Sequence, residues 1–229
     1  MAKPQLKPTA DQTFEFIGSG AYDFVKVLAD ARTLQQQGRV EEACNQRFQA
    51  FQRLMAFLPE DEEVVLEWNH RNSRAVIELL EATAVDHFLI GDYEMSAAML
   101  ELLLELDPED HLEATTLLAF DYQAMNEQEL FDEVINDVSD KAPERLLLML
   151  WAAFRREHAL PQGELKRLRE RFPACYAEFM AEEHPADEQY LRDIESEHPS
   201  REAEARELWL RTESLWGQFP EFIEALRQA

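Results

Sequence analysis

Apolar residues recur along most of the chain at the three- and four-residue spacing of an amphipathic helix. Leu100, Leu103 and Leu104 follow this spacing, and so do Phe219 and Phe222 near the C-terminal end. No long stretch of the sequence shows the strict alternation of apolar and polar residues that is typical of a half-buried strand. The pattern therefore predicts an all-α protein.

Prolines and the few glycines lie between the periodic segments rather than inside them. A proline stops a helix, or occupies a first turn in which its missing N–H is not needed. This punctuation predicts twelve helices. They cover residues 21–36, 39–57, 61–89, 92–106, 109–125, 127–139, 143–158, 161–171, 173–183, 186–197, 200–216 and 220–227.

The chain is strongly acidic, with 47 Asp and Glu against 22 Lys and Arg and a formal net charge of −25. Nucleic-acid binders gain affinity when Lys and Arg displace counterions from phosphate, and an acidic surface repels phosphate. The charge therefore excludes most nucleic-acid binders and favours basic or metal-loaded partners. Because 46% of the residues are hydrophobic, the sequence indicates a folded protein rather than a disordered acidic chain.

The charge is unevenly distributed, because no Lys or Arg occurs between Arg74 and Lys141. Eighteen acidic residues lie in this interval: Glu78, Glu81, Asp86, Asp92, Glu94, Glu101, Glu105, Asp107, Glu109, Asp110, Glu113, Asp121, Glu127, Glu129, Asp132, Glu133, Asp137 and Asp140. The interval is interpreted either as a surface for a basic peptide or protein, or as a solvated face that maintains solubility. A basic island follows between Arg155 and Arg171, where intramolecular or solvated roles are expected ahead of contacts with a second copy.

An internal repeat becomes visible when the expected turns are aligned. The best-matched unit covers residues 77–110, with Ala84 and Ser96 at small positions, Gly91 at the turn and Pro108 after the second helix. The chain here resembles the tetratricopeptide repeat family, whose helix-turn-helix units are 34 residues long. Small residues allow the two helices of such a hairpin to approach closely, and stacked hairpins bury the remaining apolar face.

Weaker matches lie on either side of this unit. The preceding unit has Gly38 at the turn, and the following unit has Ala119 at a small position but Asn126 in place of the turn glycine. The resemblance implies a right-handed α-α superhelix of three hairpins over residues 21–142, after an N-terminal extension over residues 1–20. Residues 143–229 are expected to form a less regular helical section packed on the array. The alternative is an irregular helical bundle.

Members of this family bind peptides in a concave groove lined by the first helix of each repeat. The matching positions in this chain are Glu78, Glu81, Val85, Phe88, Glu113, Thr116, Phe120 and Gln123. Glutamates beside aromatic rings suit the Lys or Arg side chains of a basic partner. The alternative for the apolar members of the set is a role in the core between repeats.

Two Glu-x-x-His spacings provide the sharpest enzyme hypothesis. Glu67 with His70, and Glu195 with His198, resemble the pairs with which helical bundles hold two iron or manganese ions. Against this interpretation, His198 precedes a proline, where helical backbone is disfavoured. The sequence contains no His-Glu-x-x-His motif, nucleophile elbow or phosphate-binding loop. We therefore expect a protein that is not an enzyme and uses no cofactor.

The remaining features concern the cellular setting and the partners. Cys44 and Cys175 lack the spacing of a zinc site or redox dithiol, so reduced thiols are expected. The sequence shows no signal-peptide pattern and no apolar run of membrane-spanning length, which predicts a cytoplasmic protein without membrane contact. The predicted function is a non-catalytic interaction module or adaptor for a basic protein or peptide, with the oligomeric state open. The alternatives are a helical metalloenzyme and an acidic nucleic-acid mimic.

Overall fold

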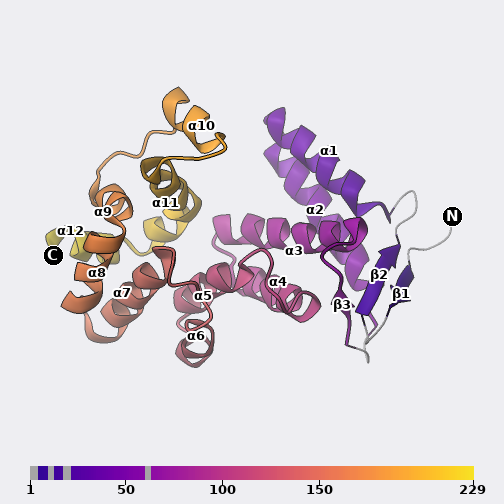
Figure 1. Cartoon of the computed structure of the whole chain (residues 1–229), viewed down its shortest axis with the longest axis horizontal. Helices are drawn as coiled ribbons and strands as arrows, with labels where there is room; N and C mark the ends of the chain where they lie inside the picture. The colour runs from indigo at the N-terminus through magenta and orange to yellow at the C-terminus, as the bar shows by residue number, and fades with distance from the viewer. Residues whose placement is uncertain (1–4, 10–12, 18–21, 60–62) are drawn as a thin grey trace. The chain divides into compact units, whose positions relative to one another are not determined.

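The structure, a computed structural model, describes residues 5–9, 13–17, 22–59 and 63–229. Most of these residues are helical, so the prediction of a mainly helical protein is confirmed (Figure 1). The helices are α1 (Phe24–Gln36), α2 (Val40–Met55), α3 (Arg71–Leu89), α4 (Tyr93–Leu106), α5 (Ala114–Met125), α6 (Gln128–Val134), α7 (Glu144–Glu157), α8 (Gln162–Arg171), α9 (Pro173–Met180), α10 (Glu188–Ile194), α11 (Arg201–Gln218) and α12 (Pro220–Gln228).

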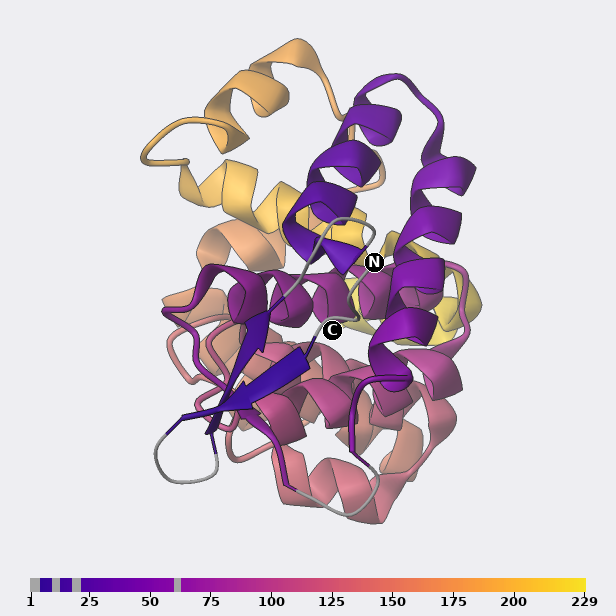
Figure 2. The ribbon, with the colours of Figure 1, turned by 90° about the vertical axis from the view of Figure 1, so that its right-hand side faces the viewer.

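A small three-stranded sheet was not predicted from the sequence. Strand β1 (Gln5–Pro8) pairs antiparallel with β2 (Thr13–Ile17), and β2 pairs parallel with β3 (Val65–Leu66). Strands β1 and β2 are the two indigo arrows in Figure 2. The helix expected over residues 61–89 is wrong in its first part, because strand β3 lies there and α3 begins only at Arg71. The amide of Phe16 donates a hydrogen bond to Ser73 Oγ over 3.4 Å, which fastens β2 to the start of α3.

The chain divides into two compact units. Unit 1 comprises Met1–Phe88 and Asp92–Asp121, and unit 2 comprises Leu89–Gly91 and Tyr122–Ala229. The last change of unit therefore falls inside α5, between Asp121 and Tyr122. The boundary after residue 142 stays a prediction. The described part of the expected N-terminal extension forms β1 and β2 and belongs to unit 1.

Short turns join α1 to α2, α3 to α4 and α5 to α6. The residues expected at these turns, Gly38, Gly91 and Asn126, all adopt left-handed backbone conformations, with φ of 74°, 80° and 65°. Glycine has no Cβ to oppose this conformation, and asparagine tolerates it better than most residues. The predicted turn positions are therefore confirmed, including the turn at which asparagine replaces glycine.

Small residues lie at the centre of the helical packing in unit 1. Ala31, Ala43, Ala84 and Ala119 are all buried, as is Ser96. Small side chains allow neighbouring helix backbones to approach closely, which is the role that the sequence pattern predicted for Ala84, Ser96 and Ala119.

Helix α5 begins five residues later than predicted, at Ala114 instead of residue 109. Asp110 and Glu113 have φ values of 50° and 54°, which interrupt the helix. The Asp110 carboxylate accepts hydrogen bonds from the amides of Ala114 over 2.6 Å and Thr115 over 3.2 Å. Asp110 thus satisfies two N–H groups at the start of α5, as a capping side chain does.

Aromatic side chains form the core of unit 2. Trp151 is fully buried, and its ring contacts those of Trp216, Phe219 and Phe222 at centroid distances between 5.1 and 6.4 Å. The Trp216 Nε1–H donates to Thr212 Oγ1 over 2.7 Å, so the polar edge of this buried ring is satisfied. These rings come from α7, α11, α12 and the residue between α11 and α12, and they hold the helices of unit 2 together.

Candidate functional site

Three of the eight predicted groove residues lie on one accessible stripe of α3. Glu78, Glu81 and Val85 are partly exposed, and their spacing of three and four residues places them on the same side of the helix. Thr116 is also partly exposed, and Glu113 is exposed in the residues before α5. These five side chains are accessible from solvent.

The other three predicted groove residues belong to the core. The exposed fractions of Phe88, Phe120 and Gln123 are 1%, 2% and 0%. The Phe88 ring packs edge-on against Tyr93 at a centroid distance of 5.6 Å. None of the three can contact a partner while the helices around it stay packed. The alternative role considered for the apolar positions, in the core between helices, is the one observed for Phe88 and Phe120.

The accessible glutamates of α3 have intramolecular neighbours. Glu78 lies 3.6 Å from Arg32 and 3.5 Å from Arg74, in two ion pairs whose arginines are largely exposed. Exposed ion pairs of this kind contribute little to stability, because water solvates both charges well. A Lys or Arg side chain of a partner can therefore displace Arg32 or Arg74 from Glu78 with little loss of free energy.

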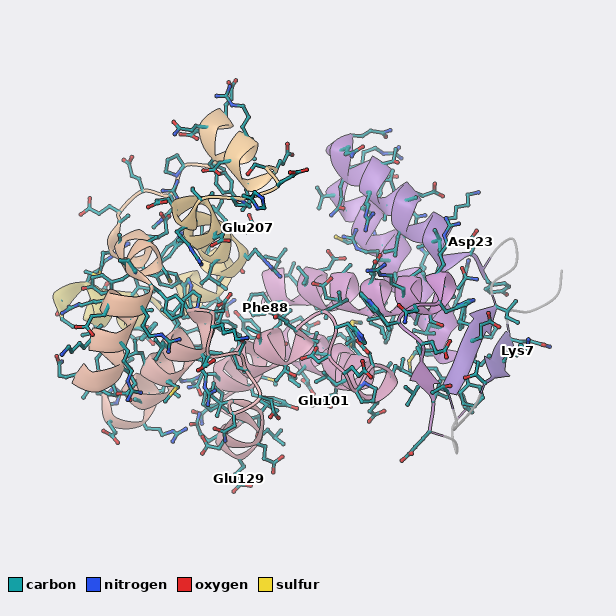
Figure 3. The ribbon with its side chains drawn as sticks, viewed as in Figure 1. Lys7, Asp23, Phe88, Glu101, Glu129 and Glu207 are labelled. Atoms are coloured by element: carbon teal, nitrogen blue, oxygen red, sulfur yellow. The ribbon has the colours of Figure 1, made fainter. Side chains whose placement is uncertain are left out.

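A second acidic row lies on the solvent-facing side of α4. Glu94, Glu101 and Glu105 are exposed and are spaced by seven and four residues, so they share one helix face. Figure 3 shows Glu101 on α4 and also Glu129, an exposed acid of α6. The acidic interval of the sequence thus contributes several exposed carboxylates in each unit.

The basic island makes intramolecular contacts within unit 2, as expected. Arg155 donates to the backbone carbonyl oxygens of Gln123 and Ala124 near the end of α5. Arg156 Nη2 lies 2.7 Å from Asp132 Oδ1, and its Nε donates to Gln128 Oε1 over 2.7 Å. These arginines therefore hold α7 against the end of α5 and α6.

The two Glu-x-x-His spacings do not lie on helical faces. Glu67 and His70 precede α3, and His70 Nε2 lies 2.8 Å from Glu15 Oε1 of β2. Glu195 is the C-cap of α10, and His198 lies beyond that helix. Across residues 5–9, 13–17, 22–59 and 63–229, no three His, Cys, Asp or Glu side chains are grouped so that they could hold one metal ion.

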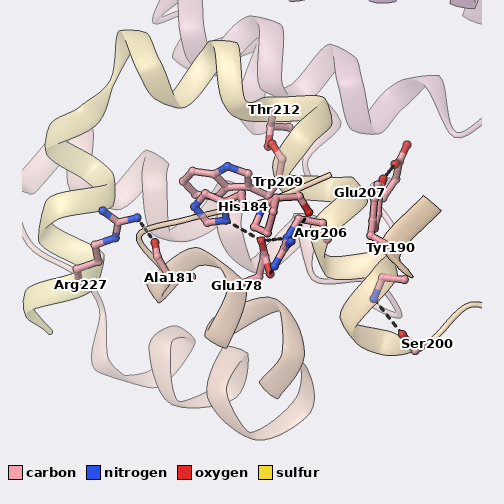
Figure 4. A network of polar contacts seen from close by, with 12 residues as sticks. Glu178, Ala181, His184, Tyr190, Ser200, Arg206, Glu207, Trp209, Thr212 and Arg227 are labelled. Atoms are coloured by element: carbon pink, nitrogen blue, oxygen red, sulfur yellow. Dashed lines mark hydrogen bonds and ion pairs between the residues drawn. The ribbon is translucent and has the colours of Figure 1, made fainter. Parts of the chain in front are cut away.

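Unit 2 contains a buried polar network that the sequence did not predict (Figure 4). Glu178 of α9 has a side chain only 9% exposed, and it accepts two hydrogen bonds from the Arg206 guanidinium of α11. Arg206 Nη1 also donates to the carbonyl oxygen of Pro185 over 2.7 Å. The hydrogen bond to Glu178 raises the pKa of Arg206, so the guanidinium stays charged.

His184 is the third member of this network. Its side chain is 7% exposed and its Nδ1 lies 2.6 Å from Glu178 Oε1. Its ring stacks on Trp209 at a centroid distance of 3.8 Å. The segment between α9 and α10 is thereby fixed to α11. Six residues separate Glu178 from His184 and twenty-eight separate it from Arg206, so no local pattern indicated these contacts.

The two cysteines are free thiols, partly exposed at Cys44 and buried at Cys175. Burial raises the pKa of both thiols, and the neighbouring carboxylates of Asp86 at Cys44 and Glu144 at Cys175 act in the same direction. A raised pKa keeps a thiol protonated and weakly nucleophilic. Neither cysteine therefore has the electrostatic surroundings of a reactive thiolate.

Comparisons of the chain with models of protein families, with curated proteins and with solved structures find no match. Among the described helices, none is both long enough and apolar enough to cross a lipid bilayer.

Proposed function

We propose that this protein is a non-catalytic interaction module of the tetratricopeptide-like kind, with its helical hairpins arranged as a right-handed superhelix. It binds a basic peptide or a basic protein segment on the stripe of α3 that contains Glu78, Glu81 and Val85. The observation that carries the proposal is this stripe, an accessible pair of glutamates beside an apolar side chain on the first helix of a hairpin. No Lys or Arg occurs from residue 75 to residue 140.

The stripe has the chemistry that a Lys or Arg side chain needs. The carboxylates accept charge-assisted hydrogen bonds, and the apolar Val85 contacts the aliphatic stem of a long basic side chain. Glu113 and Thr116, the accessible groove positions at α5, extend the acceptor groups to the next hairpin. Because exposed charges are screened by salt, binding through this surface weakens as ionic strength rises.

The test immobilises the full chain and captures partners from native lysate at low and at moderate salt. The affinity of each recovered partner is then measured. The triple variant Glu78→Lys/Glu81→Lys/Glu113→Lys reverses three charges of the proposed surface. We expect it to weaken a genuine partner by at least about tenfold, because rim and groove charges set both the rate and the specificity of association.

A matched control separates a local surface from net charge. The variant Glu94→Lys/Glu101→Lys/Glu105→Lys reverses three exposed charges on α4 and changes the net charge equally. We expect it to retain the affinity of the wild-type protein. Equal losses in both triple variants would show that binding follows total charge. Unchanged binding in both would place the contact surface elsewhere in the chain.

A further inference from the structure

Asp121 is a fully buried acid of α5, and it is the last residue of α5 that belongs to unit 1. Its exposed fraction is 0%, and neither of its carboxyl oxygens has a hydrogen-bond partner among the residues that the structure describes. In the sequence it stands between apolar or aromatic residues, and Ala119, Phe120 and Tyr122 are buried with it. A buried carboxylate without partners is strongly disfavoured, so this position needs a physical explanation.

The polar groups that act on Asp121 come from α4. Tyr93 and Ser96 are buried, and no described residue is a hydrogen-bond partner of either hydroxyl oxygen. Asp92, the N-cap of α4, is the charged group whose field reaches Asp121, and it is negative. Asp92 is itself 3.0 Å from His87 Nδ1. The surroundings of Asp121 therefore supply hydroxyl groups and a like charge, whereas the sequence supplies no Lys or Arg from 75 to 140.

These surroundings favour the protonated form of the carboxyl. Burial, the largest cause, raises the pKa of Asp121 to about 8, and Asp92 acts in the same direction while the Ser96 hydroxyl opposes both. Burial and the neighbouring Asp121 raise the pKa of Tyr93 to about 12, so this phenol stays neutral. At neutral pH the buried side chains of Asp121, Tyr93 and Ser96 therefore carry no charge in the folded protein.

We propose that Asp121 is a proton-dependent latch, whose protonated carboxyl is compatible with the packing of α5 against α4 and whose ionised carboxylate loosens it. The geometry that supports this is a carboxyl group with no exposed surface and with the hydroxyl groups of Tyr93 and Ser96 beside it, to which no cation of the described chain is paired. Asp121 is the last residue of unit 1, and the same helix continues into unit 2 at Tyr122. The latch therefore acts within α5, at the last residue of unit 1.

The sign of the effect follows from the two protonation states. In the unfolded chain an aspartate loses its proton near pH 4, whereas the folded protein holds the proton of Asp121 up to about pH 8. Between these values the folded state binds one proton more than the unfolded state. The stabilisation from this proton is complete below about pH 4 and is lost as the pH rises toward 8. The unfolding equilibrium constant then increases about tenfold per pH unit.

The first experiment compares wild-type protein with Asp121→Asn in urea unfolding at several values from about pH 5 to about pH 9. We expect the ratio of the wild-type to the variant unfolding constant to rise about tenfold per pH unit up to about pH 8 and then to level off. Glu105→Gln removes an exposed carboxylate of α4 and is the control, whose ratio should stay constant. A constant ratio for Asp121→Asn would overturn the proposal.

The second experiment uses wild-type protein only, so it does not depend on the folding of a variant. Wild-type protein labelled with ¹³C at the aspartate carboxyl carbons is titrated by NMR, and amide hydrogen exchange of α5 is followed over the same range. We expect one aspartate resonance to titrate near pH 8. Above that value, amide exchange in α5 should be faster relative to the intrinsic rate of an unstructured chain at the same pH. If every aspartate carboxyl titrates below about pH 5, Asp121 is ionised in the folded protein and the latch does not exist.

Discussion

Glu178 in unit 2 and Asp121 in unit 1 are both buried acidic side chains, and they differ in the groups that surround the carboxyl. Glu178 accepts hydrogen bonds from Arg206 and lies 2.6 Å from His184 Nδ1. Asp121 has no hydrogen-bond partner in the described part of the chain, and the negative Asp92 acts on it. A buried carboxyl group is tolerated either when cationic donors compensate its charge or when a proton removes the charge.

Burial alone therefore does not determine how a buried acid affects stability. The cation of Glu178 comes from a helix distant in sequence, so this acid fastens α9 to α11. The charged group that acts on Asp121 is the negative Asp92, so among the described residues no cation compensates this acid. The first acid therefore contributes to tertiary structure through an ion pair, whereas the second makes stability depend on pH.

The largest loss of stability is expected when the Arg206 guanidinium is removed from Glu178. Arg206→Met keeps much of the side-chain volume but leaves a carboxylate that is 9% exposed without its guanidinium partner. We expect a loss of about 3–5 kcal/mol in the free energy of unfolding, as found when one partner of a buried pair is removed. Urea denaturation at neutral pH measures this loss.

The control for this variant is Arg201→Met in the first turn of the same helix. The Arg201 side chain is 82% exposed and pairs with Glu204 over 3.4 Å. We expect its removal to leave the urea midpoint unchanged within error, because such pairs are screened by water. Equal losses for the two variants would mean that Arg206 acts through its helix rather than through Glu178.

An intermediate effect is expected at the buried pair of unit 1. Arg47 donates from Nε and Nη2 to the two Asp86 oxygens, both over 2.7 Å, with side chains 4% and 15% exposed. Arg47→Met should cost about 2–3 kcal/mol, less than Arg206→Met, because water reaches Asp86 more easily than Glu178. A loss larger than that of Arg206→Met in urea denaturation would contradict this ranking by exposure.

The sequence predicted local structure much better than these pairings. Helices such as α4 and α7 were placed to within a residue or two, because apolar periodicity and flanking turn residues act over short distances. Strand β2 was missed although Phe14, Glu15 and Phe16 alternate, since five residues are too few to outweigh the helical pattern around them. The turn between α5 and α6 was found even without a glycine.

The candidate site was predictable only in part. The stripe of Glu78, Glu81 and Val85 follows from helical spacing alone, whereas the matching row on α5 depends on where that helix begins. Asp121 did carry a local signal, an acid inside an otherwise apolar run. The partners of Glu178 carried none, because the fold alone brings α9 and α11 together.

A smaller effect, of opposite sign, is expected when both charges of the unit 2 pair are removed. The double variant Glu178→Gln/Arg206→Met leaves no buried carboxylate, so it should recover about 2 kcal/mol relative to Arg206→Met. The measurement is a double-mutant cycle completed with Glu178→Gln in urea denaturation. Without such recovery, the stabilisation by Arg206 would come from packing and from its bond to Pro185 rather than from Glu178.

The smallest effect is expected at Arg39, which tests whether burial or ion-pair geometry determines the energy. Arg39 Nε and Nη2 donate to the two Glu42 oxygens over 2.6 and 2.5 Å, a two-pronged geometry like that of Arg47 with Asp86. Its side chain is 50% exposed, so water solvates both groups in the folded and the unfolded chain. We expect Arg39→Met to leave the urea midpoint within measurement error, while Arg47→Met in the same helical pair lowers it clearly. If the two variants lose equal stability, the geometry of the pair outweighs its burial, and the contrast between the buried acids of the two units would need another cause.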